Sequence, residues 1–422
     1  MRIISGCDRI LLLLLIIFMF AGNMFASPTV EQLIYNFTSF PDNEPNAGLV
    51  TDGEGNLYGT AASGESNPCG TVFELSPPTT SGGSWTKITL YSFQESDTDG
   101  CGPSSTLIFD KAGNLYGTTD GGGPKNRGSV FELSPPATSG GAWSESVLFI
   151  FPAGRLRGYA PSGKLVFDGA GNLYGITQFG GYDLINCNCG TVFQLKPPAR
   201  TGGHWTQTVL HNFGAAGNDG QNPLAGLLFR AGALYGTTQA GGTSNNGIVF
   251  QLVQKNGVWD ENILYKFGGR DGSSPGGLIF DGTGNLDGVT SAGGTSPCAC
   301  GTIFRLSPPA VPGNPWQETT LYSFLGHSDG ARPFEPVWRD KLGNLYGTAP
   351  GGGVKNAGTV FKLKAPAISG GDWTLVVLHD FLARSNLDGN TPRSELILVK
   401  GVFYGVTIFG GYDWGTVYSV VP

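Results

Sequence analysis

An aspartate begins each of five Asp-Gly-x-x-Pro motifs along the chain. These residues are Asp99, Asp219, Asp271, Asp329 and Asp388, and Arg157 takes the same position in a sixth copy. Five carboxylates around one channel mouth could bind a ligand or a cation such as calcium, which favours carboxylate oxygens. In the alternative, which their regular repetition favours, each aspartate caps its own turn by accepting backbone N–H bonds. We keep the six residues as candidate ligand contacts.

A further candidate ligand contact is Asp287, which replaces the tyrosine of a repeated Leu-Tyr-Gly string. A carboxylate inside a sheet needs a compensating partner, because an unpaired charge away from water is costly. Drift in a single repeat explains this substitution more simply than a catalytic role does.

The cysteines suggest disulfide bonds. Cys7 lies in the N-terminal segment, and the other six are Cys69, Cys101, Cys187, Cys189, Cys298 and Cys300. An even number in an exported chain favours disulfides. We place Cys69 and Cys101 on loops of the same face and predict a bridge between them. The two Cys-x-Cys pairs favour local disulfides over one shared metal site, because they lie two repeats apart.

No catalytic constellation can be recognised in the sequence. The four histidines are scattered, and His211 and His379 stand where other repeats have a tyrosine, which we interpret as a packing position. No Ser-His-Asp arrangement, phosphate-binding loop or His-x-x-His motif is present. Paired carboxylates for glycoside hydrolysis need only spatial proximity, so that activity stays open. We expect no catalytic residues and no metal or cofactor, apart from calcium at the aspartates.

Composition limits the class of protein that must position these residues. The 422 residues include 69 Gly and 27 Pro, 11% are aromatic, and only 14% are charged, against roughly 25% in an average protein. Many aromatics with few charges exclude a disordered chain, and the absence of a three-residue glycine period excludes collagen. The net charge is -7 with no basic cluster, so we expect no nucleic-acid partner.

The N-terminus has the features of an export signal. Arg2 and Arg9 precede an unbroken apolar run of 11 residues at 10–20, which is short for a membrane span of about 20 residues. We predict a signal peptide over residues 1–26 and an exported protein, extracellular or periplasmic, with no membrane span after signal removal. An uncleaved anchor is the alternative.

A repeat organises the remainder of the chain. The string Asn-Leu-Tyr-Gly-Thr at 56–60 returns with variation six more times, at spacings of 52 to 61 residues. Its glycines are Gly59, Gly117, Gly175, Gly236, Gly288, Gly347 and Gly405. Seven units fill nearly all of residues 27–422, which we predict to form a single domain.

Each unit contains four strand-like segments, which we call strands A to D. In the second unit they lie at 107–109, 115–118, 128–131 and 143–151, and they are apolar or aromatic runs bounded by Gly, Pro, Asn and Asp. The connections from A to B and from C to D shorten in some units to a tight turn, as at Asn256-Gly257. Turns of this size join adjacent antiparallel strands. Each unit is therefore predicted to form one antiparallel sheet.

The order of the strands predicts a closed ring. Strand D precedes strand A at the N-terminus, at 34–37, and the last unit ends at strand C with Tyr418. The N-terminal strand would therefore complete the last sheet. Seven four-stranded sheets closed in this way form an all-β, seven-bladed β-propeller.

The repeated strings carry a family resemblance. Asp110 to Thr119 and Gly121 to Phe131 show the pattern most plainly. It resembles the GloVer-type tandem repeat of exported bacterial proteins and is similar to NHL-type propeller repeats, while Gly-Gly followed by Trp is similar to kelch repeats. The resemblance covers all seven units and implies an exported repeat protein, without a known ligand or reaction. Asp287 in unit five, and the loss of the hairpin Asn in units four and seven, depart from the pattern.

Function is predicted from the variable loops. The loops between strands B and C are longest in units three and five, where they carry the Cys-x-Cys pairs, and variable loops on a fixed scaffold commonly bind ligands. We expect a monomeric, non-enzymatic protein that presents this loop-rich face to a glycan, a cell-envelope component or a protein. A glycan-active hydrolase or lyase with acidic residues at the channel mouth, and a purely structural surface protein, are the alternatives.

Overall fold

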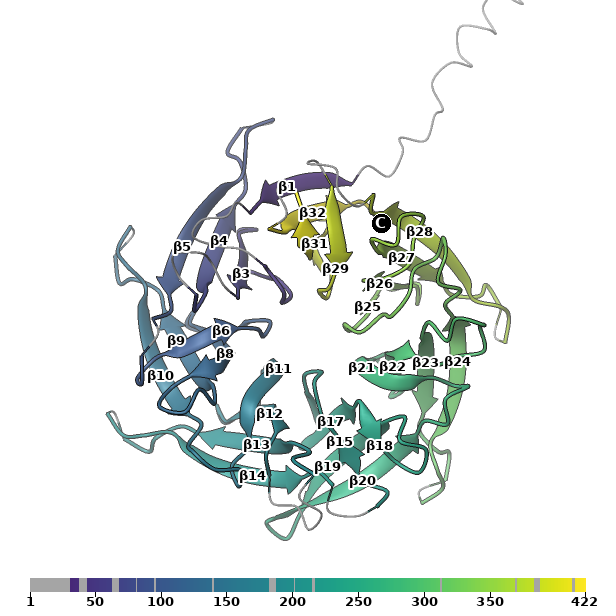
Figure 1. The fold of residues 1–422 in the computed structure, drawn as a ribbon, viewed down its shortest axis with the longest axis horizontal. Helices are drawn as coiled ribbons and strands as arrows, with labels where there is room; N and C mark the ends of the chain where they lie inside the picture. The colour runs from purple at the N-terminus through teal and green to yellow at the C-terminus, as the bar shows by residue number, and fades with distance from the viewer. Residues whose placement is uncertain are drawn as a thin grey trace, which may run out of the picture.

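The computed structural model describes residues 31–37, 44–62, 68–80, 82–94, 96–138, 140–181, 187–200, 202–214, 217–311, 313–368, 370–382, 388–411 and 414–422. They form seven antiparallel blades around a central axis, and one of the blades carries an additional two-stranded sheet (Figure 1). The predicted all-β, seven-bladed propeller is therefore confirmed. The predicted signal peptide, 1–26, lies outside the described residues. Among the described residues, no helix is long and apolar enough to cross a membrane.

The blades follow one another in chain order. Blade 1 comprises β2 (Val50–Thr51), β3 (Leu57–Ala61), β4 (Thr71–Ser76) and β5 (Thr86–Ser92). Blade 2 comprises β6 (Gly100–Pro103), β7 (Ile108–Phe109), β8 (Leu115–Gly122), β9 (Ser129–Ser134) and β10 (Ser144–Ile150), and blade 3 comprises β11 (Tyr159–Phe167), β12 (Leu173–Phe179), β13 (Thr191–Lys196) and β14 (Thr206–Asn212). Blade 4 comprises β15 (Gly220–Gln221), β16 (Leu228–Arg230), β17 (Ala233–Thr238), β18 (Ala240–Gly241), β19 (Ile248–Lys255) and β20 (Val258–Lys266).

The remaining blades have the same plan. Blade 5 comprises β21 (Ser273–Phe280), β22 (Leu286–Ala292), β23 (Thr302–Ser307) and β24 (Gln317–Ser323), and blade 6 comprises β25 (Trp338–Arg339), β26 (Leu345–Ala349), β27 (Thr359–Lys364) and β28 (Thr374–Asp380). Blade 7 comprises β29 (Gly389–Pro392), β30 (Ile397–Val399), β31 (Val402–Gly410), β32 (Thr416–Val420) and the N-terminal strand β1 (Gln32–Asn36). Strand A is innermost, and strand D runs along the rim (Figure 1).

The repeated glycine of strand B makes room for an aromatic ring. A Cβ added to Gly117 would lie 2.6 Å from Cζ of Phe131 on strand C of the same blade. The strand B glycine meets the strand C aromatic in this way in all seven blades. Since real Cβ atoms do not approach so closely, only glycine fits under the ring.

The same strand C ring also joins neighbouring blades. Phe93 at the end of strand D in blade 1 lies edge-on to Phe131 of blade 2, with ring centroids 5.0 Å apart. Equivalent contacts recur around the ring at Phe151–Phe193, Phe213–Phe250, Phe267–Phe304, Phe324–Phe361, Phe381–Tyr418 and Phe37–Phe73. These side chains are at most 1% exposed. Edge-to-face pairs of this kind contribute about 0.5–1.5 kcal/mol each beyond the burial of their area.

The N-terminal strand closes the ring as predicted. Strand β1 pairs antiparallel with β32, and Gln32 lies opposite Ser419. Phe37 then contacts Phe73 of blade 1, with centroids 5.3 Å apart. The first and last parts of the chain therefore share one blade, and this blade packs on the first.

Removal of the closing aromatic ring tests this arrangement. We expect Phe37→Ala to reduce the free energy of unfolding by about 3–5 kcal/mol, since Phe37 is buried between blades 7 and 1. Thermal or denaturant unfolding would measure the change. Phe409→Ala, at a position 45% exposed, is the matched control and should change stability little. Equal effects of the two substitutions would contradict the closure.

Candidate functional site

The five aspartates of the Asp-Gly-x-x-Pro motifs accept hydrogen bonds within their own loops. Asp99 accepts the backbone N–H groups of Gln94 at 2.7 Å and Gly100 at 2.6 Å, and Asp329 accepts those of Leu325 and Gly326. The other three, Asp219, Asp271 and Asp388, each accept at least one backbone N–H group from their own loop. The geometry agrees with the turn-capping alternative. Ligand binding by these residues stays a prediction.

The aspartates also lie where two blades meet. The Tyr91 hydroxyl, on strand D of blade 1, donates to Asp99 at 3.0 Å. Glu145, on strand D of blade 2, lies close enough to Asp99 for the two charges to interact. We call such a group an inter-blade junction: the loop aspartate, the strand D residue before it, and a strand D residue of the next blade. The same arrangement unites Tyr265, Asp271 and Glu318.

The loops of these aspartates fold back against the outer strands, whose tyrosine or histidine side chains they contact. This geometry favours the turn-capping alternative over a ring of carboxylates at the channel mouth. None of the five lines the central cavity among the described residues. At the junction where Arg157 replaces the aspartate, the Gln207 side chain instead donates to the Arg157 backbone carbonyl at 2.9 Å.

The junction glutamates are protonated more readily than usual. Burial raises the pKa of Glu145 to about 7, and the Asp99 carboxylate adds to the rise. Burial likewise raises the pKa of Glu318 to about 7, where Thr320 opposes and Asp271 reinforces the change. A protonated glutamate can lie beside an aspartate without charge repulsion.

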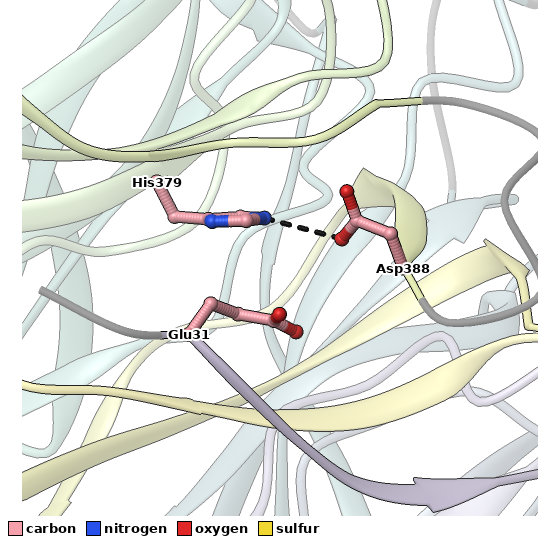
Figure 2. A group of neighbouring side chains, drawn as sticks. All are labelled: Glu31, His379 and Asp388. Carbon is pink, nitrogen blue, oxygen red and sulfur yellow. Dashed lines mark hydrogen bonds and ion pairs between the residues drawn. The ribbon is translucent and has the colours of Figure 1, made fainter. Parts of the chain in front are cut away.

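Two junctions contain histidine in place of tyrosine. Figure 2 shows Glu31, His379 and Asp388 converging, with His379 Nε2 3.1 Å from Asp388 Oδ1. At the other junction, His211 Nε2 lies 3.5 Å from Asp219 Oδ1 and 3.7 Å from Glu261 Oε1. The prediction that these histidines are packing residues is correct for their rings, because His211 lies edge-on to Phe213 and His379 lies edge-on to Phe381. It missed the carboxylates that face their ring nitrogens.

A cavity of about 810 Å³ occupies the central channel. Its walls come from the innermost strands and from the segments that enter them from the D–A loops. Phenyl rings and charged groups share this wall, among them Phe167, Phe229, Lys164, Glu335, Arg393 and Glu395. Cavities of this size with a few polar groups are typical of small-ligand sites.

An ion pair crosses the channel. Lys164 Nζ, on β11 of blade 3, lies 2.7 Å from Glu395 Oε1, which belongs to blade 7. Glu335 of blade 6 lies nearby: burial raises its pKa to about 7, Glu395 adds to the rise, and Arg393 and Lys164 oppose it. The channel therefore contains both fixed charges and a carboxyl group that can exchange a proton near neutral pH.

Blade 3 adds an aromatic group beside the channel. The Arg127 guanidinium lies 3.9 Å from the Tyr159 ring centroid, and Phe179 lies 5.5 Å from the same ring. Asn188, within the Cys187–Cys189 loop, donates to the Tyr159 hydroxyl at 2.7 Å. Phe179 also lines the cavity. The variable loop thus positions Tyr159 beside Phe179 at the end of the channel where the B–C and D–A loops lie, which we call the loop-bearing end.

Asp287 has the partners that a buried carboxylate requires. It is fully buried and binds Arg305 at 2.7 Å and Arg339 of blade 6 at 2.8 Å. In blades 1 to 4 the equivalent position is a tyrosine that packs on a phenylalanine of the next blade, as Tyr116 does on Phe167. The Asp287–Arg339 pair therefore replaces an aromatic contact between blades.

The predicted disulfides are present. Cys69 and Cys101 are joined, with Cα atoms 4.2 Å apart, and local bridges join Cys187 to Cys189 and Cys298 to Cys300. The Cys69–Cys101 bridge links a B–C loop to a D–A loop, as predicted from their common face. Three disulfides are compatible with an exported protein.

The junction glutamates were not predicted as site residues, although they recur at one position of the repeat. Glu145, Glu261 and Glu318 each stand two places after the tryptophan of strand D, so their recurrence was visible. The channel group had a weaker signal. Lys164 and Glu395 both stand three places after the proline of the repeated motif, but the two residues differ in charge, and Glu335 stands only two places after it.

The family model of the Gloeobacter/Verrucomicrobia repeat matches residues 22–213 and 185–418. The chain belongs to this repeat family. None of the curated proteins compared with it matches.

Two solved structures resemble this Gloeobacter/Verrucomicrobia repeat protein in fold. An ulvan lyase of polysaccharide lyase family PL25 is 10% identical, with a TM-score of 0.50 over 90% of this chain and 95% of the lyase. A protein from Thermus thermophilus described as an oxidoreductase (glucose dehydrogenase) is 17% identical, with a TM-score of 0.44 over 83% of this chain and 99% of that one. At these identities the likeness shows the fold alone.

The Asp287 ion pair gives a stability prediction for this repeat protein. Asp287→Ala leaves two arginines without their buried partner, and we expect a loss of about 3–5 kcal/mol in the free energy of unfolding. The double variant Asp287→Tyr with Arg339→Phe restores the aromatic contact of the other blades and should be neutral or stabilising. Denaturant unfolding measures both. A double variant as unstable as Asp287→Ala would contradict this account.

The junction glutamates give a prediction for pH. Because the pKa of Glu145 rises from 4.5 unfolded to about 7 folded, its contribution to stability is present below pH 4.5 and lost as the pH rises through 7. Glu145→Gln cannot ionise, so its stability should fall less than that of the wild type between about pH 5 and pH 8. Thermal unfolding at both values measures this difference. Glu54→Gln, at an exposed hairpin, is the control, and an identical pH response in all three proteins would refute the assignment.

Proposed function

We propose that the protein is a glycan-binding propeller that holds its ligand at the loop-bearing end of the central channel. The observation that carries this proposal is the cavity of about 810 Å³, whose wall combines phenyl rings with charged side chains from several blades. Sugars present both C–H faces, which pack on aromatic rings, and hydroxyl groups, which need donors and acceptors.

The channel charges suit a ligand rich in hydroxyl groups. Lys164 and Arg393 donate hydrogen bonds, and Glu335 and Glu395 accept them. In the free protein Lys164 and Glu395 satisfy each other at 2.7 Å. A sugar hydroxyl, which both donates and accepts, can enter between the two groups and satisfy both. The ligand would therefore exchange one polar contact for two.

The aromatic group of blade 3 extends the proposed site toward the loops. Tyr159 is held between Arg127 and Asn188, so its ring needs little ordering when a ligand binds. Preorganised aromatic side chains reduce the entropic cost of association. A glycan chain that leaves the channel would pass over Tyr159 and Phe179. The three disulfides are compatible with an exported protein, which would meet glycans outside the cytoplasm.

We propose binding without catalysis. The recurrence of the same strings in every blade argues against an enzyme, although the channel residues Lys164, Glu335 and Glu395 do differ from blade to blade. Glu335 is the residue that favours catalysis. A glutamic acid with a pKa of about 7 beside a second carboxylate could act as a general acid. A propeller of similar fold acts on a polysaccharide in the ulvan lyase, and one of its structures holds -[GlcA(1-4)Rha3S]-. Glycan cleavage is therefore the second candidate function.

Binding is tested by thermal unfolding of the purified protein with a panel of neutral and acidic polysaccharides. A ligand at about 100 times its dissociation constant adds about 2.7 kcal/mol to the stability of the folded state. We expect at least one glycan to stabilise the protein. Lys164→Met should weaken binding of that glycan about tenfold or more, which corresponds to about 1.4 kcal/mol.

The matched control is Lys255→Met. Lys255 also forms an ion pair, with Asp260 at 3.3 Å, but both side chains are exposed in the β19–β20 hairpin. It should bind glycan as the wild type does. Equal binding by Lys164→Met and the wild type would place the ligand elsewhere. If the protein releases reducing ends or unsaturated sugars from a glycan, and Glu335→Gln abolishes this release, the function is catalysis rather than binding. If no glycan stabilises the protein, a protein partner or a structural role is favoured.

A further inference from the structure

We infer that the two histidine-containing junctions are binding sites for a divalent transition-metal ion of the zinc class. One site consists of His211, Asp219 and Glu261, and the other of Glu31, His379 and Asp388. In each group the candidate ligand atoms lie within 4.8 Å of one another. This inference is independent of the proposed glycan function, because neither group lines the central cavity.

The spacing at the first site fits a shared ion better than a hydrogen bond. His211 Nε2 lies 3.5 Å from Asp219 Oδ1 and 3.7 Å from Glu261 Oε1, whereas hydrogen bonds span about 2.7–3.2 Å. Two ligands at about 2.0–2.1 Å from a tetrahedral zinc ion lie roughly 3.4 Å apart. The three side chains therefore approach the separation that a common ion requires.

Unpaired polar atoms point to the same conclusion. His211 Nε2 and Glu261 Oε1 are buried from solvent and make no hydrogen bond within the described structure. Glu31 Oε1 at the second site is in the same condition. Buried polar atoms without partners are uncommon and costly. A cation between the side chains would satisfy all of them.

The tyrosine junctions satisfy their aspartates without an ion, although Glu145 Oε1 beside Asp99 is also buried without a hydrogen bond. Tyr91, Tyr265 and Tyr322 occupy the histidine position and donate their hydroxyl protons to the aspartates, at 3.0, 2.7 and 2.9 Å. The tyrosine thus supplies the aspartate with a proton donor. Histidine introduces a ring nitrogen that binds metal when neutral, and at both histidine junctions a glutamate completes the set.

The donor set determines the class of ion. One imidazole nitrogen and two carboxylates suit zinc and neighbouring divalent transition metals, whereas calcium takes oxygen ligands only. Three protein ligands leave a position for water. Each ion would link strand D of one blade to the loop and strand D of the next. At the second site it would bind the residue before β1 to blades 6 and 7 (Figure 2), and so reinforce ring closure.

The experiment measures zinc binding to the chelator-treated full protein by calorimetry and elemental analysis, with thermal unfolding in parallel. We expect two zinc ions per chain and a rise in unfolding temperature that chelator reverses. His211→Tyr and His379→Tyr should each retain one ion, and the double variant none. Because tyrosine occupies this position at three other junctions, these variants should fold, and their unfolding in chelator verifies it.

Two further variants sharpen the test. His204→Tyr changes an exposed histidine outside the junctions and should leave two ions bound. Tyr265→His places histidine beside Asp271 and Glu318 and should add a third. A lack of stoichiometric zinc uptake would overturn the inference. Zinc binding that survives the double variant, or a response to calcium alone, would overturn it as well.

Discussion

The edge-to-face contact between blades is the interaction on which the rest of this structure depends. A phenylalanine at the end of each strand D meets the strand C aromatic of the next blade at about the same distance, 5.0 to 5.4 Å, all the way around. That aromatic in turn covers the strand B glycine of its own blade. One ring per blade therefore fixes both the packing within the blade and the angle to its neighbour, which explains why both residue types recur in every repeat.

This framework leaves two regions free to differ from blade to blade. At the junctions, an aspartate loop lies against the end of strand D, and the strand D residue that faces the aspartate can be tyrosine or histidine. In the channel, Lys164 of blade 3 and Glu395 of blade 7 form an ion pair that no other two described blades share at these positions. The charged groups of these two regions differ between blades, whereas the aromatic contacts recur in every blade.

The sequence predicted what repeats with the fold and missed what depends on the contact of distant blades. The glycine spacing, the displaced strand D at 34–37 and the loop positions of Cys69 and Cys101 were sufficient for the blade number, the ring closure and one disulfide. The aspartates were found and turn capping was the favoured interpretation, but their contacts with the strand D side chains were missed, because strand order does not say how far a loop folds back toward the outer strands. Lys164 of blade 3 and Glu395 of blade 7 lie far apart in the sequence, and only the assembled propeller brings them together.

Hydrogen–deuterium exchange with and without a bound glycan tests the central claim, ligand binding in the channel, most directly. The account predicts slower exchange in the segments that line the cavity at the loop-bearing end, residues 160–167 and 393–395 above all, with the C–D turns unchanged. Protection confined to the C–D turns or the outer strands would contradict it, because the ligand would then lie on a surface that every blade shares.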